Sequence, residues 1–174
     1  MHLTIVIPII KFNCYSTAMM QKLARIEYKY EFVHFLFAVS NESVATELKL
    51  LLGNFVNDYK IIVANTYSSN ALRACAKSAN TNYIYFHDCD DYADYDYLDG
   101  FCRDLSDSDE IICFNVHKYV YDENCNIVQE YDIFQNKEGK IVNICNLPTC
   151  VYSKIIHKKY LYYIDFPNLP YTQD

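Results

Sequence analysis

Three carboxylates follow directly after an apolar, aromatic run in the middle of the chain. Residues Tyr83–His87 have the composition of a buried strand, and Asp88, Asp90 and Asp91 come straight after it. Carboxylates this close together repel one another, so they are costly unless a cation or water compensates. Mg2+ and Mn2+ prefer oxygen ligands of this kind. Ligands of open α/β sheets bind just beyond the carboxyl ends of strands, so the stretch predicts a metal-assisted site for a phosphate-bearing ligand. The alternative is an acidic surface turn.

Other residues could contribute to such a site. Arg73 lies on the predicted helix before the acidic stretch, where a guanidinium could meet a diphosphate or neutralise the carboxylates. The alternative is a surface arginine. The pair Gln173 and Asp174 matters only if the chain folds back towards the carboxylates. The histidines show no zinc-ligand spacing, and His87 is the one nearest the acidic stretch.

Composition limits the classes of protein to consider. The chain has 174 residues, of which 52% are hydrophobic, enough for one folded domain with a core. A net charge of -7 argues against nucleic acid as the partner. No apolar run approaches the roughly 20 residues of a membrane span. The eight cysteines include no C-x-x-C pair, and no basic leader precedes Leu3. We therefore expect free thiols and a cytoplasmic protein, with the inner membrane face as a peripheral location.

Strand and helix patterns alternate in the first half of the chain. We expect four strands, at Leu3–Ile9, Val33–Val39, Tyr59–Asn65 and Tyr83–His87. Between them we expect three helices, at Ser16–Tyr30, Ser43–Leu52 and Ser69–Ala79. This alternation predicts an α/β fold with a largely parallel sheet covered by helices on both faces.

The second half has a different pattern. It predicts a helix at Tyr95–Leu105, a long strand at Glu110–Tyr121 and a return strand at Ile127–Ile133. A short helical segment is expected near Ser153–Tyr163. This half is predicted to be antiparallel or mixed. No linker divides the chain, so residues 1–174 are expected to form a single domain.

Three ordered segments of the chain together resemble glycosyltransferase family 2. Leu3–Pro8 resembles the family's opening strand, and Ser69–Asp91 resembles its helix, strand and D-x-D-D motif. Val151–Asp174 resembles the later segment that runs into an E-D pair, with Gln173 in place of the glutamate. The resemblance implies the GT-A fold, a Rossmann-like mixed sheet flanked by helices. It also divides the chain into a nucleotide-sugar-binding half (1–91) and an acceptor-side half (92–174).

Several positions depart from the family pattern. Pro8 is not followed by the usual P-x-x-N sequence, and Ser40 stands where a carboxylate usually contacts the nucleobase. Asn70 and Arg73 match the family's R-N-x-G only approximately. Family members usually continue well beyond the E-D pair, so the resemblance implies an incomplete acceptor-side half.

The activity implied by the resemblance is an inverting sugar transfer from a nucleotide-diphosphate sugar, with UDP as the expected nucleotide. Asp90 would ligate Mn2+ or Mg2+, Asp88 would contact the ribose or a metal-bound water, and Asp91 would support them. Asp174 would be the base that takes the proton of the acceptor hydroxyl. Nucleotide-sugar contacts would also come from the matching positions, which are Pro8, Ser40, Asn70, Arg73 and Asp88. The acceptor would be a saccharide or a lipid-linked glycan of surface polysaccharide biosynthesis.

Two alternatives and one open question remain. The chain could be a degenerate or truncated domain that binds a nucleotide-sugar without transferring it. D-x-D also follows an apolar strand in HAD-type phosphatases, although there the motif normally follows the first strand. The oligomeric state is open, with a homodimer among the options because apolar surface such as Phe166 would be exposed.

Overall fold

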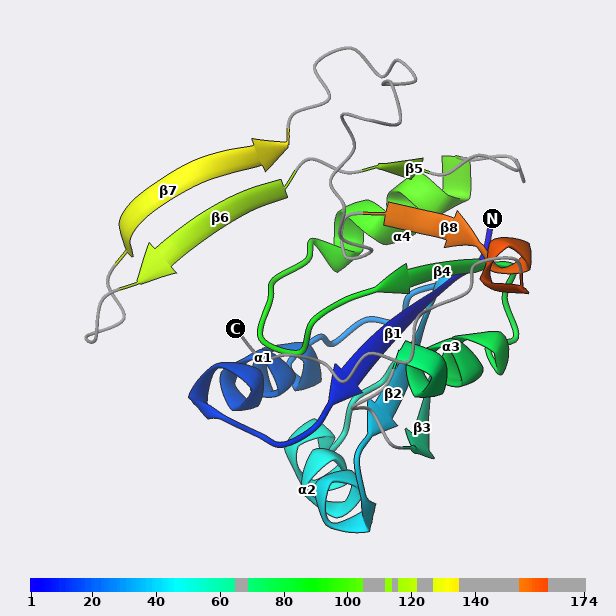
Figure 1. The fold of residues 1–174 in the computed structure, drawn as a ribbon. Coiled ribbons are helices and arrows are strands. Elements are labelled where there is room, and N and C mark those ends of the chain that lie inside the picture. The colour runs from blue at the N-terminus through cyan, green and yellow to red at the C-terminus, as the bar shows by residue number, and fades with distance from the viewer. Residues whose placement is uncertain (65–68, 105–111, 114–115, 122–126, 135–153, 163–174) are drawn as a thin grey trace.

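The computed structural model describes residues 1–64, 69–104, 112–113, 116–121, 127–134 and 154–162. In this part of the chain a mixed sheet carries helices on both of its faces (Figure 1). The predicted α/β class with a mixed sheet flanked by helices is therefore confirmed. The elements of the first half, in chain order, are β1 (Leu3–Ile9), α1 (Cys14–Ala24), β2 (Val33–Val39), α2 (Glu42–Leu52), β3 (Tyr59–Val63), α3 (Ser69–Lys77) and β4 (Tyr83–Phe86).

The strand order of the main sheet is β3-β2-β1-β4-β8-β5. The first four strands are parallel, and Leu3 of β1 lies between Val33 of β2 and Tyr83 of β4. The strand β8 (Lys154–His157) pairs antiparallel with β4, and β5 (Ile112–Cys113) pairs antiparallel with β8. A parallel core with an antiparallel continuation agrees with the change of pattern expected in the second half.

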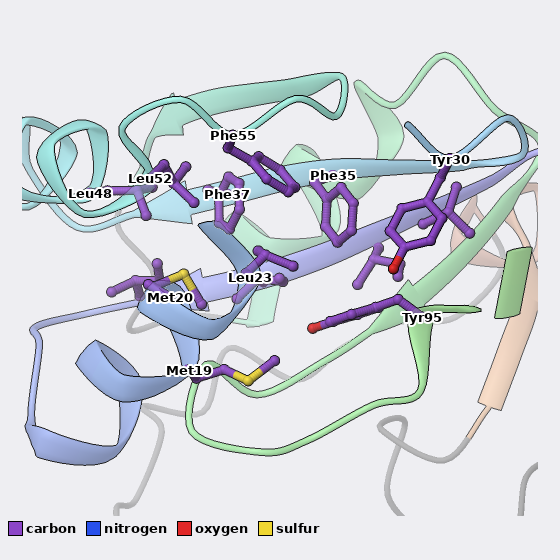
Figure 2. Packing of buried hydrophobic residues seen from close by; sticks show 14 of the residues in the cluster. Met19, Met20, Leu23, Tyr30, Phe35, Phe37, Leu48, Leu52, Phe55 and Tyr95 are labelled. Carbon is purple, nitrogen blue, oxygen red and sulfur yellow. The ribbon is translucent and has the colours of Figure 1, made fainter. Parts of the chain in front are cut away.

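Two apolar layers sandwich the sheet because β1 is buried on both of its faces. The odd-numbered residues of β1, such as Ile5 and Ile7, pack with buried side chains of α1, α2 and α4 (Tyr95–Asp104). Figure 2 shows part of this layer, in which Phe35 and Phe37 of β2 lie over Leu23 of α1. On the other face, Val6 packs with α3 and with the 3-10 helix η3 (Lys158–Tyr162).

Helix ends follow the capping residues rather than the apolar pattern alone. Asn13 caps α1 and Asn41 caps α2, each accepting a bond from a backbone N–H three residues later. The helix predicted at Ser16–Tyr30 is too long, because α1 ends at Ala24. Asn57 holds the following loop outside the helix: its Oδ1 accepts from the Tyr30 backbone N–H at 2.6 Å.

Other boundaries shift by a few residues. The strand β3 ends at Val63, α3 ends at Lys77 and β4 ends at Phe86, each short of its predicted end. The hairpin strand β7 (Ile127–Phe134) extends one residue beyond its prediction.

One prediction for the second half is wrong, and another is confirmed only in part. Glu110–Tyr121 is not one strand, because β5 belongs to the main sheet whereas β6 (Val116–Tyr121) forms a separate hairpin with β7. The short helical segment expected near Ser153–Tyr163 is present only as η3 at Lys158–Tyr162, because Lys154–His157 forms β8 instead. Pairing with β4 buries Ile155 on one face of the sheet and Ile156 on the other, and a helix could not do this.

Two general expectations can be compared with the structure. The thiols of Cys14, Cys75, Cys89 and Cys102 are free, and Cys75 and Cys102 are buried. Among the described helices, none combines the length and the apolar character needed to cross a membrane.

Candidate functional site

The sheet has a topological switch point between β1 and β4. From β1 the chain builds outwards to β2 and β3, then crosses back to place β4 on the other side of β1. The helix α1, which follows β1, packs on one face, whereas α3, which leads into β4, packs on the other. Open α/β sheets bind their ligands in the crevice outside the carboxyl ends of the two strands at such a switch point.

The predicted acidic residues lie at this switch point. The backbone N–H of His87 donates to the carbonyl of Val6 in β1 at 3.0 Å, so the sheet contacts continue to His87. Asp88–Asp91, here called the acidic turn, follows at once. The turn is closed by the Asp91 N–H, which donates to the Asp88 carbonyl at 3.1 Å. The structure therefore brings all three predicted carboxylates to the carboxyl ends of these strands.

Burial and charge repulsion both act within the acidic turn. Loss of hydration, followed by repulsion from Asp90, raises the pKa of Asp91. Burial raises the pKa of the Cys89 thiol to about 12, and the carboxylates of Asp90 and Asp88 add to this rise. A hydrogen bond with Ser16 acts on Cys89 in the opposite direction, which places the turn beside the first turn of α1. A cation bound here would relieve the repulsion.

The carboxylates of the acidic turn fit a divalent cation that takes its other ligands from phosphate and water. Among the described residues, no three Asp, Glu, His or Cys side chains converge to form a complete metal site. Mg2+ is commonly held by one or two carboxylates, with substrate phosphates and water as the remaining ligands. Asp90 and Asp91 are both exposed and adjacent, which fits this mode. The turn therefore fits a cation that arrives with a phosphate-bearing ligand rather than a preformed metal centre.

Ser40 and Pro8 lie at the same edge of the sheet. Ser40 directly follows β2, and its N–H donates to the Ile9 carbonyl at 3.1 Å. Its hydroxyl donates to the Ile10 carbonyl at 2.5 Å, which ties the ends of β1 and β2 together. Pro8 of β1 pairs with Ala38 of β2, just below this junction. Ser40 and the acidic turn flank β1, two strand spacings or about 10 Å apart.

Arg73 is held by a different part of the molecule. Its Nε donates to the carbonyl of Leu161, and its Nη2 donates to the carbonyl of Tyr162 at 3.2 Å. These bonds fasten α3 to η3. Asn70 lies in the first turn of α3, whereas Asp174 lies outside the described residues. Roles for these three residues in ligand binding remain predictions.

Sequence reasoning missed the contact that closes the loop carrying the acidic turn. His87 precedes this loop and Tyr95 ends it as the first residue of α4; Nδ1 of His87 lies 3.5 Å from the Tyr95 hydroxyl. Burial lowers the pKa of His87 to about 4, so its imidazole is neutral at pH 7. Nε2 of His87 is buried and has no hydrogen-bond partner among the described residues. In the sequence, the contact was indicated only by Tyr95, an aromatic residue at the start of the predicted helix.

One cavity of the described structure lies at the opposite edge of the sheet. It has a volume of about 900 Å³ and is lined by His2, His34 and Lys60, among others near the amino ends of the strands. The amino ends of α1 and α2, whose backbone N–H groups favour anions, are at the carboxyl edge instead. The chemistry predicted for the acidic turn therefore belongs to the carboxyl edge and not to this cavity.

Comparison with known proteins gives a fold but no family. No protein-family model matches the chain, and no curated protein sequence matches it. The chain is similar to S. aureus TarS 1-349 in complex with UDP-GlcNAc, with a TM-score of 0.61 and 15% identity over 94% of this chain. The complex of the same protein with UDP gives a TM-score of 0.58 at 16% identity. The chain spans 47% of the length of TarS 1-349.

A second kind of enzyme shares the fold. The 4-diphosphocytidyl-2C-methyl-D-erythritolsynthase from Anaerococcus prevotii DSM 20548 has a TM-score of 0.54 at 9% identity. The likeness covers 93% of this chain and 74% of that one. At identities this low, the structural likeness shows a shared Rossmann-like fold and nothing more.

Proposed function

We propose that this chain binds a nucleotide-diphosphate sugar at the crevice between β1 and β4 and transfers the sugar to a hydroxyl acceptor. The observation that carries the proposal is the position of the acidic turn, with Asp88, Asp90 and Asp91 at the switch point of the sheet. Two further observations support it. The turn fits a cation that shares its shell with phosphate oxygens, and a solved structure with the same fold holds UDP-GlcNAc.

In this proposal, different residues at the carboxyl edge of the sheet bind different parts of the ligand. Ser40, which follows β2, and Pro8, near the end of β1, hold the nucleoside, with UDP as the proposed nucleotide. Asp90 and Asp91 hold Mn2+ or Mg2+ together with the diphosphate, and Asp88 contacts the ribose or a metal-bound water. A cation bound there supplies positive charge beside the departing nucleotide diphosphate.

The acceptor side of the proposal rests on the resemblance to glycosyltransferase family 2. Asp174 accepts the proton of the attacking hydroxyl, which approaches from the face opposite the diphosphate, so the transfer inverts the anomeric carbon. A saccharide or lipid-linked glycan is the proposed acceptor. Arg73 uses two of its five N–H groups on η3, which leaves donors for a diphosphate.

Nucleotidyl transfer is a second candidate because the likeness to the A. prevotii synthase covers 74% of that chain, against 47% for TarS. A nucleoside triphosphate in the same crevice would use the acidic turn in a similar way. The two reactions differ in their products: sugar transfer releases a nucleoside diphosphate, whereas nucleotidyl transfer releases pyrophosphate. The phosphatase alternative is less well supported, since the acidic turn follows β4 and not the first strand.

The test is a product assay with UDP-sugars and nucleoside triphosphates in the presence of Mn2+. We expect UDP release from at least one UDP-sugar, by transfer or by slow hydrolysis, and its loss in Asp90→Asn. Asp104→Asn, which changes an exposed carboxylate at the end of α4, is the matched control and should keep the activity. Pyrophosphate release instead would favour the second candidate. Nucleotide binding without either product would indicate a binding domain without transfer.

A further inference from the structure

A second, smaller cavity lies beside α1 and the residues that directly follow the acidic turn. Its volume is about 370 Å³, within the usual range for small-molecule sites. Four tyrosines line it: Tyr28, Tyr30, Tyr92 and Tyr95. We call it the tyrosine cavity.

The tyrosines divide into a buried floor and exposed walls. Tyr30 and Tyr95 are each 5% exposed, and Figure 2 shows both side chains pointing into the region that Met19 also faces. Tyr28 and Tyr92 are 51% and 66% exposed, so their rings stand at the opening. An exposed aromatic ring next to a cavity offers a flat, apolar contact surface at little cost in side-chain entropy.

Hydrogen-bonding groups accompany the rings. The hydroxyls of Tyr28 and Tyr30 both donate to the Asp96 carboxylate, the second at 2.8 Å. Their rings meet edge to face with centroids 5.3 Å apart, which fixes both of them. Asp94 lines the same cavity, so carboxylate oxygens and ring faces stand side by side.

The charges around the cavity nearly cancel. Three acidic side chains, Glu27, Asp94 and Asp96, and two basic ones, Lys22 and Arg25, line it. The Lys22 ammonium already lies 3.7 Å from the centroid of the Tyr92 ring, so the protein supplies the cation for that ring. Nothing in this balance favours a strongly charged ligand. Apolar ring faces with hydrogen-bonding groups at their edges suit a neutral molecule that itself has an apolar C–H face and polar hydroxyl edges.

We propose that the tyrosine cavity binds a neutral saccharide unit, with its C–H face on the tyrosine rings and its hydroxyls on the neighbouring carboxylates. As a place for the acceptor glycan, this inference rests on the proposed transferase function. The loop from β4 to α4 connects the acidic turn with the tyrosine cavity and passes beside α1 (Figure 1). It touches α1 at Ser16 through Cys89 and at Lys22 through Tyr92. Six residues of helix separate these contacts, or about 9 Å. A glycan whose end reaches the acidic turn would therefore extend along the loop into the cavity.

Saturation-transfer NMR on the full chain tests the binding directly, with lactose, maltose and chitobiose as probes and no nucleotide present. We expect saturation transfer to at least one probe. Tyr92→Leu should weaken its binding at least fivefold, equivalent to about 1 kcal/mol, whereas Tyr92→Phe, which keeps the ring, should stay within twofold. Tyr97→Leu is the matched control, because Tyr97 is 59% exposed but does not line the cavity.

The possible results test the saccharide assignment and the proposed function separately. No transfer to any of the three probes, or binding indifferent to Tyr92→Leu, would overturn the inference. Binding of choline in place of the sugars, with the same dependence on Tyr92, would overturn the saccharide assignment in favour of an ammonium ligand. Stabilisation of the same samples by UDP and Mn2+ is measured in parallel. If UDP and Mn2+ stabilise the protein but no saccharide binds, only this inference fails. If a saccharide binds but UDP and Mn2+ do not stabilise the protein, the result counts against the proposed function alone.

Discussion

His87 and Tyr95 close the two ends of the loop that carries the acidic turn. Nδ1 of His87 lies 3.5 Å from the Tyr95 hydroxyl, and the two rings meet at a steep angle with centroids 5.8 Å apart. Both residues are buried, so the contact holds the loop by its base while the acidic turn stays at the surface. The buried polar contact between His87, which follows β4, and Tyr95 of α4 therefore helps to position the carboxylates.

This contact should be measurable as a coupling between the two side chains. We expect Tyr95→Phe and His87→Leu each to lower the free energy of unfolding by about 1 kcal/mol or more, since each removes one side of a buried polar pair. The double variant should lose less than the sum of the two, with a coupling of about 0.5–1 kcal/mol. Urea unfolding of the four proteins gives the cycle. Strictly additive losses would show that the two side chains do not interact.

The burial of His87 also predicts a pH dependence of stability. Folding lowers the pKa of His87 from about 6.5 to about 4, so the folded state favours the neutral imidazole. The contribution to stability is complete above pH 6.5 and is lost as the pH falls below it, because the unfolded chain then binds a proton that the folded chain excludes. Between pH 7.5 and 5.5 the loss should be about 1.3 kcal/mol.

The variant His87→Leu isolates this contribution. Its unfolding free energy should fall less steeply over the same pH interval, by the amount assigned to His87. Burial also lowers the pKa of His34, so part of the slope should remain. Identical slopes for the variant and the original protein would contradict the buried, neutral state of His87.

Arg73 offers a way to separate packing from ligand binding. Because its guanidinium donates to the carbonyls of Leu161 and Tyr162, Arg73→Lys should lower the unfolding free energy by about 1 kcal/mol. If Arg73 also contacts a diphosphate, the affinity for UDP with Mn2+ should fall at least fivefold in the same variant. Unchanged affinity would leave Arg73 with its packing role alone, and unchanged stability would contradict the bonds to η3.

Local pattern was enough to predict the elements of the first half. The strand at Val33–Val39 agrees with its prediction because a strand buried on both faces needs a continuous apolar run. The helix α2 agrees to within one residue, because Gly53, with a positive φ of 51°, ends it. Placing the acidic residues after a strand of this parallel sheet was also enough to put them at its carboxyl edge.

The sequence could not show which strands pair over long distances. Lys154–His157 fits the predicted helical segment locally, yet pairing with β4 turns it into β8. The break between β5 and β6 likewise depends on their partners in two different sheets. The same limit applies to the site. The bond from Ser40 to the Ile10 carbonyl and the contact between His87 and Tyr95 become visible only when the strands and helices are assembled.

Thermal unfolding with UDP, with and without Mn2+, tests the proposed nucleotide site most directly. At 100 times its dissociation constant, UDP with Mn2+ should stabilise the chain by about 2.7 kcal/mol and raise Tm by about 5–10 °C. In the proposed site phosphate oxygens complete the shell of the cation, so Mn2+ alone should produce a much smaller shift. The UDP shift should disappear in Asp90→Asn and persist in Asp104→Asn. No shift with UDP, or a shift indifferent to both Mn2+ and Asp90→Asn, would contradict a metal-assisted nucleotide site at the acidic turn.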